Sequence, residues 1–413
     1  MKRFILTITL IGTIFFTPAV IYPHDNPINA VQILWMNCRN FDEVEKSILK
    51  LKMAGVNTLI IRVFQNRYDR FYPFANPPSP PFTTSPPPPS EGGDRGEVKG
   101  GMGSSGVYFN TSYAPVIDDI LGKLVEIAHR NNIKIFAWMT TRDSSWLIEE
   151  HPDFLESIYD FKNGAIVKGE RLNIFNPEVI ERLKGVYRDL ARYDIDGILF
   201  QDDLVLRHTE GYSNEARSLF KRDTGISADP ATMYKNIYQK DGRYYVSSYT
   251  PFFWKWSEWK SKRLSHTASE IMSAAKEVNP DLKFAINLYY ETVSSPRDAL
   301  AWLSQNIDEL INHKFDYYAV MAYHRQMKRE LGFSDKKIYE MLSMMTDSII
   351  DKVGTSKILM KVQVMDWDTK ASIPEDEIEM VSKFIKKGGD VNMSFVPVTE
   401  DTPLGTIKRL FNN

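Results

Sequence analysis

Residues 196–203 read DGILFQDD, an apolar run from Gly197 to Phe200 that passes directly into two adjacent carboxylates, Asp202 and Asp203. A short, continuously apolar run is typical of a strand buried on both faces, as in a parallel sheet. Similar runs alternate along the chain with longer amphipathic stretches, which is the pattern of βα units. The predicted strands are residues 31–36, 58–64, 134–139, 197–200, 283–289, 317–323, 357–364 and 391–396.

The segments between these strands have helical periodicity. Apolar residues recur at spacings of three and four from Ile117 to Ala128, and Asn40 with Glu43 resembles a capping box for a first helix that stops at Gly55. Further helices are predicted at residues 177–192, 253–278, 299–312, 337–353, 375–387 and 404–411. A helical segment after every strand favours an α/β fold, a single closed (β/α)8 barrel spanning residues 30–413, over an open doubly wound sheet. No glycine-rich phosphate loop follows the first strand, which argues further against dinucleotide binding.

Composition narrows the class of protein. Hydrophobic residues make up 43% and charged residues 25%, as in globular proteins, and the formal net charge of -2 argues against a nucleic-acid partner. The content of 8 Trp and 20 Tyr is compatible with sugar-stacking surfaces. Cys38, the only cysteine, is expected to be a small buried side chain, which excludes thiol chemistry and structural zinc.

Two segments fall outside this pattern. Residues 1–22 have a basic start and an apolar core, the layout of a signal peptide, with an uncleaved membrane anchor as the alternative. The protein is therefore expected to be periplasmic or extracellular. Residues 76–106 carry eight prolines up to Pro89 and then seven glycines from Gly92, so we expect a disordered insertion after the second strand. A mobile lid or a tolerated surface insertion would both fit that position.

Asp202 and Asp203 are the predicted catalytic residues. Acids at the carboxyl end of a barrel strand project into the mouth where substrates bind. Because strand side chains alternate, one of the two is expected to point into the mouth while the other braces it. A carboxyl with a raised pKa can protonate a leaving oxygen, which is the central need of glycoside cleavage. Alternatively, both aspartates cap the following loop or hold a cation.

Other strand ends would contribute to the same mouth. Aromatic residues suit the apolar face of a sugar ring, and polar ones its hydroxyl groups. No cluster of His and carboxylates has metal-site spacing, so neither a metal nor a cofactor is predicted. Glu291, Asp366 and Asp143 are the candidates for a second catalytic carboxylate. The predicted substrate-binding residues are Arg62, Trp138, Asn287, Glu291, Tyr323, Gln363, Asp366 and Trp367.

From about Asn57 onward the chain resembles the C-terminal glycoside-hydrolase-like domain of the PgaB family, which acts on poly-β-1,6-N-acetylglucosamine in biofilm export. The match is carried by the DGILFQDD run, the AWM ending at Met139 and several single residues in register. These are Trp256, Lys260, Ser261, Asn287, Met321, Ala322, Gln363, Trp367, Asn392 and Pro397. The chain departs from the family at Gln201, where relatives carry His.

The resemblance implies endolytic cleavage of the partly de-N-acetylated polymer by an exported barrel, with one Asp of the pair as the essential acid. Because no deacetylase domain fits before Ala30, deacetylation is not expected. Two alternatives stay open: a non-catalytic barrel that binds and guides exopolysaccharide, and a hydrolase of another envelope glycan such as peptidoglycan.

Overall fold

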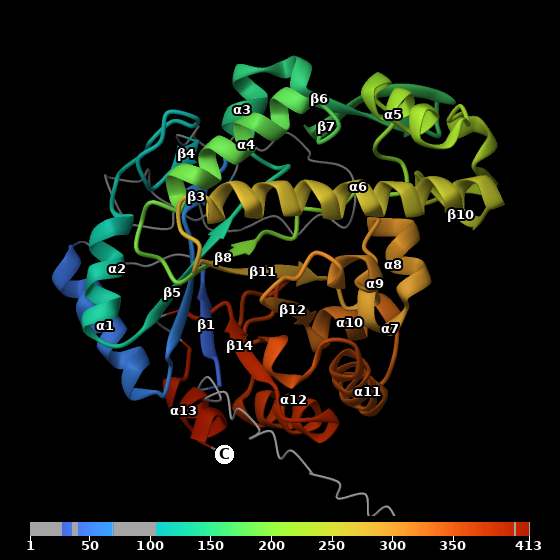
Figure 1. Cartoon of the computed structure of the whole chain (residues 1–413). Helices are drawn as coiled ribbons and strands as arrows, with labels where there is room; N and C mark the ends of the chain where they lie inside the picture. Colours follow the sequence, from blue (N-terminus) through green and yellow to red (C-terminus); the bar gives the residue numbers. More distant parts are fainter. Residues whose placement is uncertain (1–26, 35–39, 68, 70–104, 400–401, 413) are drawn as a thin grey trace, which may run out of the picture.

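The computed structural model describes residues 27–34, 40–67, 69, 105–399 and 402–412, and its main feature is a closed parallel barrel (Figure 1). Around the barrel the order is β1–β14–β13–β12–β11–β8–β5–β2, which confirms the predicted single (β/α)8 barrel. Its strands are β1 (Asn29–Ile33), β2 (Thr58–Arg62), β5 (Lys134–Met139), β8 (Gly197–Phe200), β11 (Lys283–Leu288), β12 (Tyr317–Ala322), β13 (Ile358–Gln363) and β14 (Asn392–Val396).

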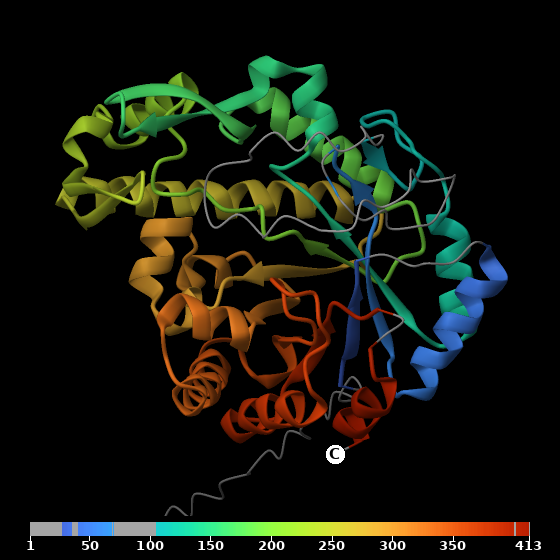
Figure 2. The same ribbon diagram turned by 180° about the vertical axis from the view of Figure 1, so that it is seen from behind.

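Helices surround the barrel on its outside, and the strands are covered by their amphipathic faces (Figures 1 and 2). The Asn40 side chain accepts a hydrogen bond from Glu43 N at 3.0 Å, as the capping pattern predicts. The principal helices are α1 (Phe41–Met53), α2 (Leu121–Arg130), α4 (Pro177–Leu190), α6 (Pro251–Lys276), α8 (Pro296–Leu303), α9 (Ile307–Ile311), α11 (Asp335–Val353), α12 (Glu375–Gly388) and α13 (Leu404–Asn412).

The structure corrects three predicted elements. The helix expected over residues 299–312 is broken into α8 and α9, because Ser304 has a positive φ and its hydroxyl donates to Leu206 O. The strand expected over residues 58–64 ends at Arg62, and β3 (Phe64–Gln65) turns away to pair with β4 (Gly106–Val107). The helix expected from Ile117 begins only at Leu121, since Ile117 N donates to Val107 O in an extended segment.

The barrel interior has its own small core, separate from the layer between strands and helices. It contains Ile60, Phe136, Leu199, Ala285 and Leu359, one inward residue from each of five strands. Gly197 belongs to the same interior, where a side chain would collide with Phe136 at 2.3 Å. Because these side chains fill the interior, a substrate site is expected at the carboxyl end of the barrel.

The carboxyl side is enlarged by insertions that the sequence did not predict. A hairpin of β6 (Leu155–Asp160) and β7 (Ala165–Leu172) follows β5, with α3 (Ser145–Glu150) before it. After β8 come α5 (Asn214–Thr224) and a hairpin of β9 (Tyr234–Lys240) and β10 (Arg243–Tyr249). Two short helices, α7 (Glu291–Ser294) and α10 (His324–Leu331), follow β11 and β12.

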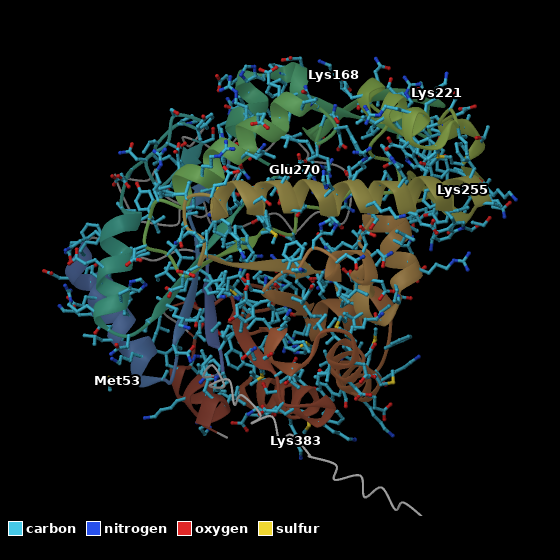
Figure 3. All side chains as sticks on the ribbon, in the orientation of Figure 1. Met53, Lys168, Lys221, Lys255, Glu270 and Lys383 are labelled. Carbon is cyan, nitrogen blue, oxygen red and sulfur yellow. The ribbon has the colours of Figure 1, made fainter. Side chains whose placement is uncertain are left out.

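The long helix α6 packs against the insertion that follows β8. Figure 1 shows it crossing the molecule, with α5 and β10 at its N-terminal end and α4 along its other part. A helix of 26 residues is roughly 39 Å long, about twice a six-residue strand, so its N-terminal part extends past the barrel. Charged side chains such as Lys168, Lys221 and Lys383 point outward at the periphery (Figure 3).

The predicted signal segment at residues 1–22, Cys38 and residues 76–104 of the predicted insertion lie outside the described residues. The chain leaves β3 for that insertion and returns at β4, and Phe64 pairs with Val107 across the gap. The described flanks of that segment, β3 and β4, therefore lie side by side after β2. Within the described part of the chain, no helix has the length and apolar character to cross a bilayer.

Candidate active site

The two aspartates that end the DGILFQDD run follow β8 at the carboxyl end of the barrel, and their surroundings differ. Asp203 is 2% exposed, and the loop after β5 supplies its hydrogen-bond donors. These are Thr140 Oγ1 at 2.7 Å, Thr141 N and Oγ1 at 2.8 Å each, and Asp143 N at 2.8 Å. Asp203 therefore ties the end of β8 to the end of β5.

The environment of Asp203 is that of a buried acceptor. Burial raises the pKa of its carboxyl and the charge of Asp143 adds to this, whereas the hydrogen bonds from Thr140, Thr141 and Asp143 oppose it. Oδ2 accepts from Thr140, Thr141 and Asp143, so that oxygen has no place for a proton. The enclosed side chain thus fixes the shape of the rim at the end of β8.

Asp202 is partly exposed and lies on the open side of the rim. The Tyr289 hydroxyl donates to its backbone carbonyl at 3.3 Å. Burial raises the pKa values of Tyr289 and Tyr323, and the charge of Asp202 raises them further. The same charge raises the pKa of Lys361 and so opposes part of the lowering that burial causes. The Asp202 carboxylate is therefore close enough to act electrostatically on Tyr289 and Tyr323, at the ends of β11 and β12, and on Lys361 of β13.

Lys361 is a cation inside the barrel, only 2% exposed. Its Nζ donates to Asn287 Oδ1 at 2.7 Å, and Asn287 Nδ2 donates to Phe200 O at 2.9 Å. Because β12 separates β13 from β11 in the barrel, this chain of hydrogen bonds crosses the interior. Burial lowers the pKa of Lys361 to about 8, so the side chain is mostly charged at neutral pH and lies in the field of Asp202.

The upper interior holds buried polar atoms that have no hydrogen-bond partner within the described chain. Each comes from a different barrel strand or its end, and Trp138 belongs to the interior core. Such atoms are rare in folded proteins unless water or a ligand meets them. These atoms are available to form hydrogen bonds with a polar ligand that enters the mouth: Gln32 Oε1, Trp138 Nε1, Gln201 Oε1, Gln363 Oε1 and Ser394 Oγ.

Aromatic rings border the same mouth. The partly exposed rings of Tyr323 and Trp367 meet edge to face, with centroids 5.6 Å apart. Trp138 is held by Phe64 in a similar contact at 6.2 Å. An apolar ring face beside acids and amides is the combination that a pyranose requires.

Of the predicted binding residues, Trp138, Asn287, Tyr323, Gln363 and Trp367 thus come together at the mouth with Asp202. Asp366 and Arg62 instead have structural ion pairs, Asp366 with Arg325 at 3.0 Å and Arg62 with Asp69 at 3.3 Å. Asp366 also accepts from the backbone of its own turn, at Asp368 N and Thr369 N.

Glu291 is the other acid of note. Burial raises its pKa to about 7, and the Glu330 charge contributes in the same direction. Its hydrogen-bond partner is Tyr290, and one carboxylate oxygen is buried without a partner. Its charge also raises the pKa of Tyr289, by less than the charge of Asp202 does.

A second layer of charged residues supports the rim. Arg171, on β7, pairs with Asp143 at 2.9 Å and approaches Glu210 at 3.9 Å. Arg142, which is fully buried, pairs with Glu210 at 2.8 Å and with Glu156 of β6 at 2.5 Å. Burial opposes ionisation of Glu210, but the two arginines prevail and hold its pKa at about 2.

Helix α6 reaches this layer through Lys260. Its buried Nζ donates to Arg207 O at 2.9 Å and to Glu210 O at 3.0 Å, in the loop that follows Asp203. Burial lowers the pKa of Lys260 to about 7. Only Lys260 of this layer is marked in the sequence by the family resemblance; Glu156, Arg171 and Glu210 were not predicted.

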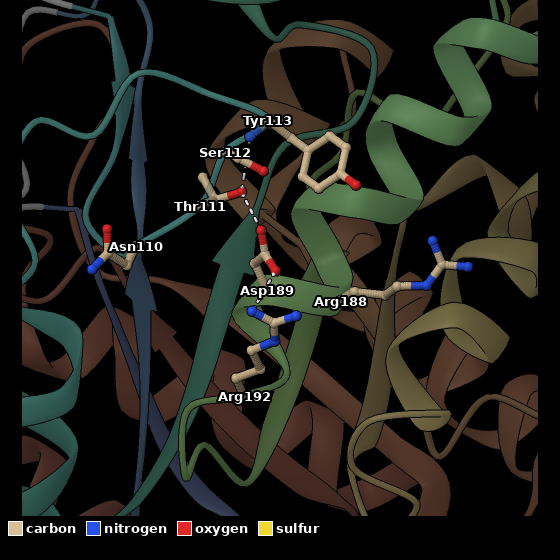
Figure 4. Close-up of a pocket in the computed structure, with 7 residues that line it drawn as sticks. All are labelled: Asn110, Thr111, Ser112, Tyr113, Arg188, Asp189 and Arg192. Atoms are coloured by element: carbon tan, nitrogen blue, oxygen red, sulfur yellow. Dashed lines mark hydrogen bonds and ion pairs between the residues drawn. The ribbon is translucent and has the colours of Figure 1, made fainter.

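Two further features do not join the site. A recess of about 550 Å³ lies on the flank of the barrel between the loop before α2 and the end of α4 (Figure 4). It is built on a Thr111–Asp189 hydrogen bond of 2.7 Å and contains no predicted site residue. Among the described residues, no group of three or more His, Cys, Asp or Glu side chains is placed to hold a metal ion.

A closed (β/α)8 barrel with acids, amides and aromatic rings at its carboxyl mouth is an arrangement suited to glycoside hydrolysis. The chain belongs to hypothetical glycosyl hydrolase family 13 (GHL13), whose model matches residues 97–396, and is accordingly a glycoside hydrolase. A search of curated protein sequences finds no match.

Solved structures share the fold at low sequence identity. The PgaB (BpsB) glycoside hydrolase domain from Bordetella bronchiseptica has a TM-score of 0.70 and 18% identity, over 94% of this chain and 99% of that one. A β-galactosidase from Bacillus circulans sp. alkalophilus has a TM-score of 0.58 and 14% identity, over 94% and 55%. The β-amylase catalytic domain from Paenibacillus polymyxa has a TM-score of 0.54 and 11% identity, over 91% and 94%.

Proposed function

We propose that this protein is an exported, endo-acting glycoside hydrolase that cleaves partly de-N-acetylated poly-β-1,6-N-acetylglucosamine, with Asp202 as the general acid. The observation that carries the assignment is the division of roles at the end of β8. Asp203 is enclosed by donors, whereas Asp202 is partly exposed beside Lys361 and the tyrosines of the mouth. A general acid must reach the leaving oxygen, and only Asp202 of the pair is open to it.

In the proposed step, the Asp202 carboxyl gives its proton to the glycosidic oxygen as the bond from that oxygen to the anomeric carbon breaks. Water adds to the anomeric carbon, and its proton passes to a second carboxylate. Asp143 is the acid proposed for that role. Its backbone N donates to Asp203, the neighbour of Asp202, and Arg171 orients its carboxylate. Asp366 is committed to its own turn.

The substrate class rests on the likeness to the PgaB hydrolase domain, which extends over nearly the whole of both chains. The aromatic edge formed by Tyr323 and Trp367 and the unpartnered amides of the mouth support a sugar ligand. Export to the periplasm or beyond, with cleavage of the segment at residues 1–22 or its retention as an anchor, is part of the proposal.

The test is a panel of glycans incubated with the purified protein, with new reducing ends as the readout. We expect release from the partly de-N-acetylated polymer, slower release from the fully acetylated polymer and none from peptidoglycan. Release of reducing ends only from peptidoglycan would show that the substrate is that envelope glycan and not poly-β-1,6-N-acetylglucosamine. If the native protein binds the polymer but produces no new reducing ends, the protein is a non-catalytic polysaccharide-binding barrel.

A further inference from the structure

The hairpin β9–β10 exposes aromatic rings that the barrel does not use. Its strands pair in register, Tyr238 opposite Tyr245 and Tyr234 opposite Tyr249. Tyr234 and Tyr249 pack on the body of the protein, where the Tyr249 and Phe253 rings stack 3.9 Å apart. Tyr238 and Tyr245 are 50% and 38% exposed and stack on each other at 5.5 Å.

On β10 the exposed Tyr245 and the packed Tyr249 lie on one face, whereas Asn236, which has a positive φ, interrupts β9 between Tyr234 and Tyr238. Side chains alternate along a strand, so Tyr245 and Tyr249 share a face, while Tyr244 lies on the other. Four residues at about 3.3 Å each place the exposed pair about 13 Å further out than the packed pair. The face thus continues outward from the body as a short row of rings.

The inner end of this row touches the rim of the mouth. Tyr249 Oη is 2.9 Å from Nδ1 of His208, which lies in the loop after Asp203. Tyr249 also has a side-chain hydrogen bond with Trp302 of α8, a ring that is 45% exposed. The same loop is fixed to the end of α8, where Leu206 N donates to Leu303 O at 3.0 Å.

The elements that carry the row lie on one side of the molecule. Figures 1 and 2 both show α8 beside the N-terminal part of α6, next to β10, and α6 contacts both elements. Since this part of α6 extends past the barrel, the rings stand beside the open mouth. A polymer that is longer than the mouth and leaves it over the β8 loop would meet Trp302 first and then the hairpin.

We propose that Trp302, Tyr238 and Tyr245 form an outer binding strip for the same glycan chain whose cleavage is proposed above. Exposed rings in a row stack on the apolar faces of successive sugar rings and tolerate variation of the substituents. A strip outside the mouth adds affinity for long chains by keeping a second stretch of the polymer close to the protein. It contributes nothing to a short oligosaccharide that fits within the mouth.

The hairpin offers a matched control for this proposal. Tyr244 is 37% exposed, almost the same as Tyr245, but it faces the other way. We compare Tyr245→Ala, Trp302→Ala and Tyr244→Ala, each also carrying Asp202→Asn so that bound polymer is not cleaved. The probe is long, partly de-N-acetylated poly-β-1,6-N-acetylglucosamine in a co-sedimentation assay.

We expect roughly three- to tenfold weaker retention of the polymer for Tyr245→Ala and for Trp302→Ala, and no change for Tyr244→Ala. Thermal unfolding of all three should match the parent protein, because the rings are exposed. Equal retention by Tyr245→Ala and Tyr244→Ala would overturn the strip.

A second measurement separates the strip from the proposed activity. With Asp202 intact, a short oligosaccharide should be cleaved equally by the Tyr245→Ala and Tyr244→Ala proteins, while long polymer is cleaved more slowly by Tyr245→Ala. Equal loss on both substrates would contradict an outer strip. If the native protein cleaves neither substrate, the proposed activity is wrong, and the co-sedimentation result still decides the strip.

Discussion

At the residue scale, the two neighbouring aspartates that follow β8 have opposite surroundings. Asp203 accepts hydrogen bonds from Thr140, Thr141 and the Asp143 backbone, while the adjacent Asp202 is left partly open. Strand alternation alone predicts such a division. It does not say which residue turns inward, because that depends on donors in the loop after β5.

Replacement of Asp203 should therefore affect stability more than replacement of Asp202. Asp203→Ala removes a buried acceptor and leaves the Thr141 and Asp143 amides unsatisfied, at a cost of roughly 2–4 kcal/mol. Asp202→Ala should change the free energy of unfolding by less than about 1 kcal/mol. Denaturant unfolding checks both values, and equal destabilisation by the two variants would refute the assigned roles.

The buried Lys361 should make the free energy of unfolding depend on pH. Its pKa in the folded protein is about 8, below the roughly 10.4 of an unfolded chain, so between these values the unfolded state binds more protons. The free energy of unfolding should consequently rise with pH there, by about 2 kcal/mol between pH 7.5 and 9.5 from this group. In Lys361→Met this part of the rise should vanish; an unchanged pH response would count against a buried cation.

At the scale of elements, much of the barrel could be predicted from the sequence. Every predicted barrel strand is present in its place, with shifts of a few residues at the ends, because parallel strands buried on both faces are continuously apolar. The hairpins on the carboxyl side were missed, although Asp241-Gly242 is a two-residue turn with positive φ at both positions, a strong hairpin signal.

The candidate site could be predicted only in part, because some of its residues lie on a hairpin and a loop outside the predicted barrel elements. Residues at strand ends such as Trp138 and Asn287 could be named from position. Lys361 carried a signal that was overlooked, since it lies two residues before Gln363 and so faces the interior with it. Arg171 and Glu210 come from a hairpin and a loop whose approach to β8 depends on long-range packing, which no local pattern contains.

The support of the rim by β6 and β7 can be tested through Arg142. Arg142→Met leaves Glu156 and Glu210 buried without their shared cation, and we expect a loss of about 3–5 kcal/mol in the free energy of unfolding. Adding Glu156→Gln should recover part of that loss. Urea unfolding provides the measurement, and a single variant as stable as the native protein would exclude the network as a support.

Within β8, Gly197 is required by the packing of the interior. A methyl group at this position would meet the Phe136 ring at 2.3 Å. Gly197→Ala should cost roughly 1–3 kcal/mol and should also lower activity, because the strand that carries Asp202 must shift. Gly122→Ala is the control for a glycine outside the barrel, because the added methyl group on α2 would meet Tyr193 only at an ordinary contact distance of 3.6 Å.

At the scale of the whole molecule, the barrel is closed and its interior is filled at the amino end, while insertions after β5, β8, β11 and β12 extend its carboxyl side. The acids of the mouth, the ring edge of Tyr323 and Trp367 and the hairpin β9–β10 all belong to that side. Membership of a glycosyl hydrolase family and the shared fold fit this construction. A long glycan rather than a small molecule is the ligand that such a surface would serve.

The central claim is that Asp202 delivers the proton that breaks the glycosidic bond. The most direct measurement is the rate of new reducing ends from partly de-N-acetylated poly-β-1,6-N-acetylglucosamine for the native protein and for Asp202→Asn, with matched unfolding curves. If Asp202 is the general acid, the variant should lose activity by at least about a hundredfold. A fully folded Asp202→Asn protein that cleaves the polymer at the native rate would contradict it.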